Sequence, residues 1–251
     1  MPPNLLILAG TTEATALARA VAERGLRGTV SFAGRVARPM RQPLPQRVGG
    51  FGGVAGLETY LHDARITHVI DATHPFAAQM SRNAVAACEA AGVPLVGLTR
   101  PSWVAQQGDD WIRIPDIAGA VAALDRPRMR VMLAVGRMHL AAFAPNPQHA
   151  YLLRLIDPPG LPLPLPEAEV VVDRGPFDAA ADRALMVRHG TGIVVSKNSG
   201  GTGAYAKIAA ARALGLPVVM IDRPASPDRI ERHDVAAVLE WIAHTGTDLG
   251  V

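Results

Sequence analysis

Lysine is almost absent from this chain of 251 residues. Of its 25 basic residues, only Lys197 and Lys207 are lysine, and the other 23 are arginine. Cysteine is scarcer still, because Cys88 is the single one. One cysteine excludes a disulfide framework and a cysteine-based zinc site, and it is typical of a protein kept in a reducing cytoplasm. We expect no metal site.

Long apolar runs are missing as well. Near the start, the apolar run Leu5–Gly10 has only six residues, no basic residue precedes it, and Glu13 follows closely. A signal peptide is therefore not expected. No stretch of 18 residues is free of charge, so a membrane-spanning helix is not expected either. The chain is predicted to be cytoplasmic and to have no membrane partner.

Acidic residues are missing from one segment of the chain. Between Glu23 and Glu58 there is no acid, but there are six arginines, namely Arg24, Arg27, Arg35, Arg38, Arg41 and Arg47. A basic segment of this kind can bind nucleic acid. Four of these arginines lie among glycines and prolines and not on a helical face, so we expect a pocket for one small anion and no nucleic-acid partner.

The composition that remains is that of a folded protein. Apolar residues make up 49% of the chain and charged residues 19%, which excludes a disordered chain. At roughly 150 residues per domain, the length corresponds to one large domain or two small ones. Strand-like and helix-like segments alternate along the whole chain, and this alternation predicts parallel sheets with helices on both faces.

The number of strand-like segments favours two domains. The expected strands are 5–9, 29–33, 47–51, 68–70, 94–98, 111–114, 131–134, 151–155, 170–172, 193–195 and 218–221. The expected helices are 12–24, 57–64, 76–91, 116–124, 138–144, 178–189, 204–214 and 234–244. We predict an α/β protein of two Rossmann-like three-layer domains, 1–102 and 103–251, with mainly parallel sheets and the active site in the interdomain cleft.

Four loops lie where such sheets bind ligands, at the carboxyl ends of strands. The first, Gly10-Thr11-Thr12, separates the first strand from the first helix, which is the place of a dinucleotide-binding loop. Only Gly10 matches the glycine fingerprint, and two interpretations are open. Either Gly10, Thr11 and Thr12 bind a pyrophosphate, or a threonine caps the helix and Glu13 stabilises its first turn.

The second loop follows the second strand and contains Ser31, Gly34, Arg35 and Arg38. At this position a carboxylate binds the ribose of NAD, whereas an arginine accommodates the 2′-phosphate of NADP. No acid occurs in the 22 residues after Arg35. If the protein binds a dinucleotide, these four residues therefore favour NADP(H). The alternative is that arginine is simply abundant in this sequence.

The third loop, residues 71–76, follows the fourth strand with the sequence DATHPF. His74 has a side chain that titrates near neutrality, so it is a candidate general acid. A second interpretation is that Thr73 and His74 contact the cofactor and His74 does not titrate.

The fourth loop, residues 196–203, follows a strand with the sequence SKNSGGTG. Its glycines let backbone N–H groups approach an anion, and Thr202 can cap the helix that follows. It is not a Walker loop, because Lys197 precedes the glycines. Tyr205 and Lys207 are two residues apart and so are not a Tyr-x-x-x-Lys pair. Both lysines of the chain fall within residues 197–207, in this loop and the helix after it, which suggests a need for a compact ammonium group.

Taken in order, these loops resemble the precorrin-6A reductase family of cobalamin biosynthesis. The matching stretches are LLILAGTTEA, SFAGRV, RVGGFGG with GLETYL, ITHVIDATHPFA, GLTRPSW, AVGRMHLAAF and VVSKNSGGTGAYAKIAAARALGLPVVMIDRP. They run from residue 5 to about residue 224, and the DATHPFA and KNSGG-type segments are distinctive of the family. Two positions depart from the pattern. Asn198 stands where the family often has Asp, and Asp222 stands where a basic residue commonly precedes Arg223, so we assign no proton transfer to Asn198.

The resemblance implies reduction by NADPH of one double bond of the precorrin-6A macrocycle, giving precorrin-6B. The substrate is then a tetrapyrrole with several carboxylates, and other enzymes of the same pathway are possible partners. The candidate substrate-binding residues are Arg137, Lys197, Ser199, Gly200, Gly201 and Thr202. Met138, Phe143 and Trp103 are available for an apolar floor or for the core. We expect mostly orientation from the protein, with His74 and Lys197 as the candidate catalytic residues.

Three other functions remain open from the residues alone. An NADP-dependent reductase or epimerase of sugar nucleotides is disfavoured by the missing Tyr-x-x-x-Lys pair and glycine fingerprint. A two-lobed small-molecule binding protein without catalysis needs no cofactor. A methyltransferase using S-adenosylmethionine usually has an acid near the position of Arg35.

Overall fold

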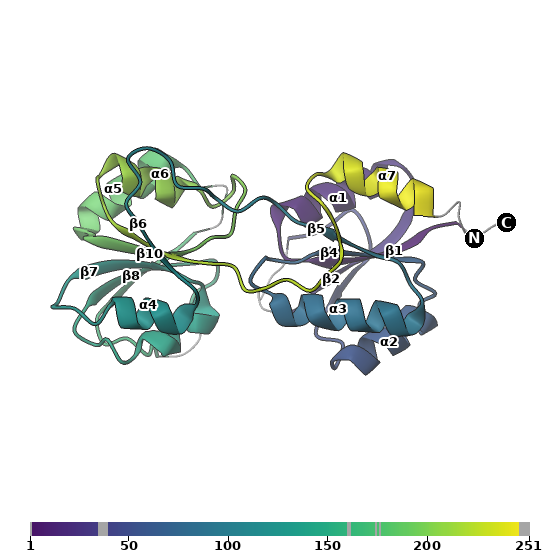
Figure 1. The fold of residues 1–251 in the computed structure, drawn as a ribbon, viewed down its shortest axis with the longest axis horizontal. Helices are drawn as coiled ribbons and strands as arrows, with labels where there is room; N and C mark the ends of the chain where they lie inside the picture. Colours follow the sequence, from purple (N-terminus) through teal and green to yellow (C-terminus); the bar gives the residue numbers. More distant parts are fainter. Residues whose placement is uncertain (1, 35–39, 160–161, 174, 176, 246–251) are drawn as a thin grey trace. The chain divides into compact units, whose positions relative to one another are not determined.

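The chain forms two compact units, as seen in a computed structural model that describes residues 2–34, 40–159, 162–173, 175 and 177–245. Unit 1 comprises Met1–Pro101 and Ala225–Val251, and unit 2 comprises Ser102–Pro224 (Figure 1). Each unit has one sheet of six described strands, all of them parallel. The expected α/β class with two parallel-sheet domains is therefore confirmed.

Unit 1 has the strand order β12-β5-β4-β1-β2-β3. Its strands are β1 (Asn4–Ala9), β2 (Arg27–Phe32), β3 (Gln46–Val48), β4 (His68–Ala72), β5 (Leu95–Leu98) and β12 (Ile230–Arg232). Its helices are α1 (Thr12–Glu23), α2 (Val54–Asp63), α3 (Ala78–Ala91) and α7 (Val235–Thr245). Strand order reverses between β1 and β4, because β2 and β3 extend the sheet on one side and β4, β5 and β12 on the other.

Helices cover both faces of this sheet (Figure 1). Alternate residues of β1 enter the two cores: Leu5 and Ile7 pack with α1 and α7, whereas Leu6 and Leu8 pack with α2 and α3. Burial on both faces explains why β1 is an uninterrupted apolar run instead of an alternating one. Asp71 of β4 lies within this buried sheet, only 1% exposed.

Unit 2 has the order β6-β11-β10-β7-β8-β9. Its strands are β6 (Trp111–Ile114), β7 (Arg130–Ala134), β8 (Ala150–Leu155), β9 (Ala168–Val172), β10 (Ile193–Lys197) and β11 (Val218–Ile221). Its helices are α4 (Ile117–Ala123), the 3₁₀ helix η1 (Arg137–Phe143), α5 (Ala179–His189) and α6 (Ala206–Ala213). The order reverses between β7 and β10. α5 and α6 pack on one face of the sheet, where Leu185, Met186 and Ile208 form a core with Met132 and Leu152.

Each sheet has one edge strand that comes, in chain order, directly after a strand of the other unit. β6 follows β5 of unit 1 but pairs with β11 of unit 2, and β12 follows β11 but pairs with β5. The predicted boundary of 103–251 for the second domain therefore differs from the structure after Pro224. The reason is that Ile230–Arg232 adds to the open edge of the first sheet and α7 packs on that sheet through Val238 and Trp241.

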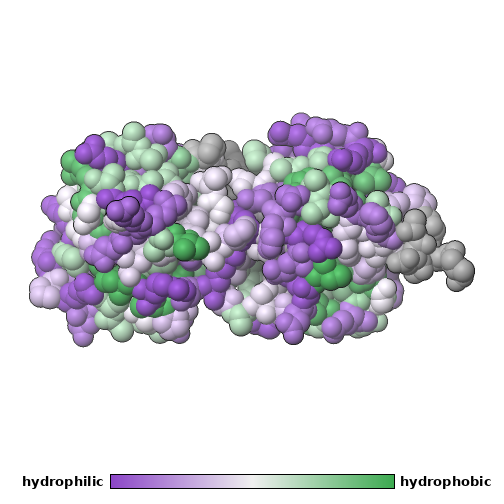
Figure 2. Space-filling model, turned by 45° about the horizontal axis from the view of Figure 1, so that its top comes forward, coloured by the Kyte–Doolittle hydropathy of each residue, from purple (hydrophilic) through white to green (hydrophobic). Residues whose placement is uncertain are grey.

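Most predicted elements agree with the observed ones to within a few residues, and 111–114 and 218–221 agree at both ends. The expectation for 138–144 is corrected, because this segment is a 3₁₀ helix. β12 was not predicted. Among the residues that the structure describes, every helix is too short or too polar to span a bilayer. On the face drawn in Figure 2, hydrophobic residues form small patches between hydrophilic ones in each unit.

Candidate active site

The candidate site in unit 1 lies at the carboxyl ends of β1 and β4, where the strand order reverses. In doubly wound sheets ligands bind in the crevice at this switch point. The loop after β1 contains Gly10–Thr12, and the loop after β4 contains Thr73 and His74. β1 and β4 pair in parallel up to Ala9 and Ala72, so both loops leave the sheet side by side.

Gly10 and Thr11 connect these two loops. A Cβ atom at Gly10 would lie 3.2 Å from the backbone nitrogen of His74, so only glycine leaves both backbones their present approach. Thr11 is the N-cap of α1: its hydroxyl accepts the N–H of Ala14 at 3.2 Å and donates to the carbonyl of Ala72 at 2.9 Å. Thr12 is exposed in the first turn. Capping and a ligand loop are thus compatible at this helix end.

Glu13 would repel an anion at this helix end if its charge were unpaired. Its carboxylate accepts a hydrogen bond from Nη1 of Arg100 at 2.6 Å, and the Arg100 side chain is only 12% exposed. Arg100 follows β5, at the same edge of the sheet. The pair offsets the negative charge, so the N–H groups of α1 remain suited to a phosphate. Residues 10–12 therefore fit a dinucleotide.

The second candidate loop begins at the end of β2. Ser31 is buried, and its hydroxyl accepts a hydrogen bond from Nη1 of Arg47 at 2.9 Å. Arg47 also donates to the carbonyl of Gly49 and stacks on Phe51, with 3.8 Å from Cζ to the ring centre. Ser31 thus serves to anchor Arg47 in this structure.

The other three candidates lie just beyond β2. Gly34 is exposed and has a φ of 76°, which favours glycine. Arg35 and Arg38 lie outside the described residues.

The loop after β4 is held by Asp71. Its Oδ1 accepts the N–H of Thr73 at 3.0 Å and the Thr73 hydroxyl at 2.7 Å. Nδ1 of His74 accepts the N–H of Phe76 at 3.2 Å, and the carbonyl of His74 accepts the N–H of Ala77 at 2.7 Å. These bonds give Thr73 and His74 a defined, half-buried position beside Gly10.

The candidate site in unit 2 lies at the equivalent switch point, after β7 and β10. Arg137 is the first residue of η1 and is exposed. Of the three residues considered for an apolar floor, Met138 is 65% exposed, whereas Phe143 is fully buried in the core. Trp103 is half-buried and packs on the core of unit 2, so Met138 alone stays available.

The loop after β10 is clamped by Trp103 and Asn198. The N–H of Trp103 donates to Oδ1 of Asn198 at 2.7 Å, and Nδ2 of Asn198 donates to the carbonyl of Trp103 at 2.9 Å. Nε1 of Trp103 donates to the carbonyl of Gly201 at 2.6 Å. An amide both donates and accepts, whereas an ionised carboxylate only accepts, so Asn198 suits this clamp. Gly200 and Gly201 have φ values of 66° and 65°.

The remaining candidates of this loop differ in exposure. Lys197 is the last residue of β10 and is half-buried. Ser199 and Gly200 are buried, Gly201 is half-buried and Thr202 is exposed. Thr202 does not cap α6, contrary to expectation, because the helix begins one turn later, with Tyr205 at the N-cap.

Lys207 has a structural role. It is 4% exposed, its Nζ donates to the carbonyl of Ala204 at 2.6 Å, and it lies 5.0 Å from the ring centre of Trp103. The second departure from the family pattern also has a partner, because Asp222 pairs with Nη2 of Arg113 at 2.8 Å.

Burial displaces the pKa values of four groups in the cores of the two units. Burial lowers the pKa of His68 and of His189, and it raises the pKa of Tyr151 to about 12. Burial, followed by the charges of Asp71 and Glu89, raises the pKa of Cys88 to about 12. Within the described part of the chain, no cluster of three His, Cys, Asp or Glu side chains is placed to hold a metal ion.

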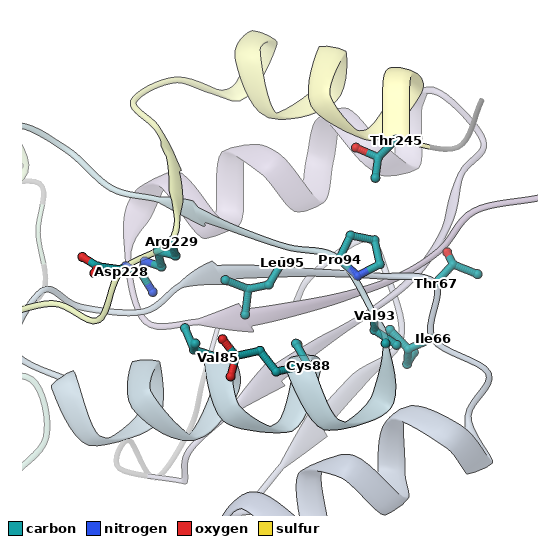
Figure 3. Close-up of a pocket in the computed structure, with 12 residues that line it drawn as sticks. Ile66, Thr67, Val85, Cys88, Val93, Pro94, Leu95, Asp228, Arg229 and Thr245 are labelled. Carbon is teal, nitrogen blue, oxygen red and sulfur yellow. The ribbon is translucent and has the colours of Figure 1, made fainter. Parts of the chain in front are cut away.

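A pocket of about 660 Å³ in unit 1 lies away from these loops. Its walls come from α3 and from the segments that precede β4, β5 and β12 (Figure 3). Val85 and Cys88 line it on α3, and Arg229 lines it ahead of β12. None of Gly10, Thr11, Thr12, Thr73 and His74 lines it.

Three residues with a clear role at the loops were not singled out from the sequence: Arg100, Asp71 and Arg229. Asp71 and Arg100 lie inside the quoted motifs DATHPFA and GLTRPSW, which was the available signal. The partners of Asp71 and Glu13 are 158 and 87 residues away along the chain, respectively, so local patterns do not indicate them.

Comparison with known proteins gives one consistent family. The model of the family described as precorrin-6x reductase CbiJ/CobK matches residues 4–243. A precorrin-6A reductase of Rhodobacter capsulatus is 55% identical, and the match covers 99% of each chain. One of Sinorhizobium is 45% identical over 96% of this chain and 94% of the relative. A solved structure of CobK precorrin-6A reductase has a TM-score of 0.94 and 54% identity over 97% of each chain.

Proposed function

Because the chain belongs to the precorrin-6x reductase CbiJ/CobK family, we propose that it reduces one double bond of the precorrin-6A macrocycle with NADPH, giving precorrin-6B in cobalamin biosynthesis. The observation that carries the proposal is the pair of switch points, each bordered by a loop suited to an anion. We assign the dinucleotide to unit 1 and the carboxylates of the tetrapyrrole to unit 2.

The loop after β1 supports the assignment of the dinucleotide. Gly10 gives a pyrophosphate access to the backbone, Thr11 and Thr12 offer hydroxyls and first-turn N–H groups, and Arg100 offsets the charge of Glu13. Thr73 and His74 lie beside Gly10 and complete the rim of this site.

The end of β2 supports NADP over NAD. No acid occurs between Glu23 and Glu58 that could bind a ribose 2′-hydroxyl, and Arg35 and Arg38 supply positive charge for a 2′-phosphate. Gly34 and Ser31 precede them, and Ser31 contributes by anchoring Arg47.

The loops of unit 2 support a substrate with several carboxylates. Arg137 is exposed directly after β7, and Lys197 ends the neighbouring strand β10. The backbone of Ser199, Gly200 and Gly201 and the Thr202 hydroxyl lie in the next loop, and Met138 offers exposed apolar surface to a flat macrocycle.

The residues of the chain contribute binding and orientation. When bound, NADPH supplies the hydride that forms one new C–H bond, and the electron pair of the double bond takes up a proton. Holding the reactants in a fixed arrangement lowers the barrier by about 7–11 kcal/mol in favourable cases. His74 and Lys197 are the two side chains that we propose to test as proton donors. The single cysteine fits an enzyme of the reducing cytoplasm.

The decisive experiment follows the visible spectrum of precorrin-6A during incubation with the enzyme and NADPH. We expect the spectrum to shift as conjugation is lost, with one NADPH oxidised per macrocycle. No change with a substrate preparation that the Rhodobacter capsulatus relative reduces would contradict the proposal. If His74→Ala and Lys197→Ala both keep turnover within about threefold of wild type, orientation without either proton donor is the better mechanism.

The cofactor preference has its own test. Arg35→Ala should weaken NADPH binding by at least about tenfold and NADH binding hardly at all, because only NADPH carries the 2′-phosphate. Fluorescence titration of both nucleotides measures this. Equal losses for both would exclude Arg35 as the 2′-phosphate ligand.

A further inference from the structure

A buried ion pair lies directly behind the loop after β4. Asp71 is 1% exposed, and its Oδ2 accepts a hydrogen bond from Nη1 of Arg229, whose side chain is 9% exposed. Its other oxygen, Oδ1, holds the N–H and the hydroxyl of Thr73. The two oxygens of one carboxylate thus connect β12 with the loop that borders Gly10.

The sequence makes room for this pair at Gly97. A Cβ atom there would lie 2.6 Å from Nε and 2.9 Å from Cζ of Arg229, which is closer than such atoms approach each other. Gly97 is the neighbour of Asp71 in the β4–β5 ladder, so the Arg229 side chain crosses β5 over the glycine to reach Asp71. Arg229 also lies 3.4 Å from Glu231, a weaker contact at 36% exposure of that side chain.

The carboxylate needs this cation. A buried charge without a partner is strongly unfavourable, and the turn at Thr73 depends on Asp71 as an acceptor. Without the guanidinium, Asp71 would gain by turning toward water, and this change weakens its bonds to Thr73. Thr73 and His74 would then lose their fixed position beside Gly10.

We propose that Arg229 is a positioning residue for the dinucleotide loop: through Asp71 it fixes the Thr73–His74 turn against Gly10. This inference rests on the proposed function, since it takes that turn as part of the NADPH site. Arg229 reaches unit 1 only after the chain has passed through unit 2, because β12 follows β11 of unit 2. The first 101 residues therefore encode the dinucleotide loop but not the cation that holds it.

The test uses the full-length enzyme and two measurements. Arg229→Met should raise the Kd for NADPH at least tenfold and speed amide hydrogen exchange at Thr73 at least tenfold in the absence of nucleotide. Arg229→Lys should recover most of both, because it keeps the charge. Asp71→Asn combined with Arg229→Met should bind NADPH more tightly than Arg229→Met alone, because no buried charge is left unpaired.

Gly97→Ala is the variant to use if Arg229→Met does not fold. Its methyl group displaces the guanidinium while every charge is kept, and it should give the same changes in Kd and exchange. Arg212→Met is the matched control, because Arg212 pairs with the buried Asp109 of unit 2 at 2.8 Å. The control should lose stability, with Kd for NADPH and exchange at Thr73 within twofold of wild type.

The outcomes separate this inference from the proposed function. The inference is overturned if Arg229→Met, or Gly97→Ala in its place, leaves Thr73 exchange and NADPH affinity within twofold of wild type. If the wild-type enzyme does not bind NADPH, the proposed function fails, and the exchange measurement still decides whether Arg229 fixes the turn. Faster exchange with unchanged NADPH affinity would overturn the claim that the turn serves the dinucleotide.

Discussion

Unit 1 and unit 2 arrange their strands in equivalent order. In each sheet, one edge strand comes directly after a strand of the other unit in the chain. They differ in the helix that succeeds the central strand. After β1 comes the 12-residue helix α1, capped by Thr11, whereas after β7 comes the seven-residue 3₁₀ helix η1 with the exposed Arg137. A capped α-helix offers a row of N–H groups to a phosphate, which η1 does not provide.

The two units also hold their ligand loops by different chemistry. In unit 1, the buried Asp71–Arg229 ion pair stands behind the loop after β4. In unit 2, the amide of Asn198 and the indole of Trp103 clamp the loop after β10. A neutral amide leaves no net charge beside a loop that we assign to carboxylates. The same fold thus holds two loops of different character, and the side chains around the loops, not the sheets, make the difference.

Thiol labelling gives the largest expected effect and observes unit 1 alone. Cys88 lies in the core between α3 and the sheet, and its pKa is raised to about 12 by burial and by the charges of Asp71 and Glu89. At pH 8 its thiolate fraction is on the order of a thousandfold below that of an exposed cysteine. We expect labelling by a maleimide to be slower by at least that factor and to reach the normal rate in denaturant. Rapid labelling of the native protein would show that unit 1 opens readily.

The clamp of unit 2 gives the next largest effect. Trp103→Ala removes the bond to Gly201 and the contacts with Tyr205 and Lys207, and it should cost about 3 kcal/mol of unfolding free energy. Chemical denaturation measures the loss. Trp103→Phe keeps the ring but not the N–H donor, and should cost about 1 kcal/mol. NADPH affinity should not change in either variant, and a parallel loss of NADPH binding would contradict the division of roles.

Acid gives the smallest effect, and it acts on both units. Burial lowers the pKa of His68 in unit 1 and of His189 in unit 2 below 6.5. A lowered pKa contributes stability that is present above pH 6.5 and is lost as the pH falls toward the pKa of the folded state. Between pH 7 and pH 5.5 we expect a loss of up to about 1 kcal/mol per histidine.

Replacing each histidine in turn shows how much of this loss of stability comes from each unit. His68→Gln and His189→Gln should each remove about half of the pH dependence measured by chemical denaturation. An unchanged profile in either variant would place the titrating group elsewhere.

Local patterns predicted most of the secondary structure and the positions of the loops. Apolar runs indicated eleven of the twelve described strands, and Gly10 with the two threonines after β1 indicated the first loop. β12 was not predicted because it is three residues long and lies at a sheet edge. Ile230 and Glu231 are exposed, so the strand has no buried face that would give an apolar pattern. Ser31 and Trp103 were identified as candidates, but whether each faces a ligand or a neighbour depends on distant contacts.

The sequence by itself determined the class of fold, the positions of the loops and the family, because these depend on local periodicity and on motifs of a few residues. Only the tertiary structure decided which sheet each strand joins and which charges meet. Asp71 and Arg229 are 158 residues apart, and their pairing depends on β12 joining the sheet of unit 1 and on the space that Gly97 leaves. Neither is a property of a local segment, since both arise when strands distant in the chain align in one sheet.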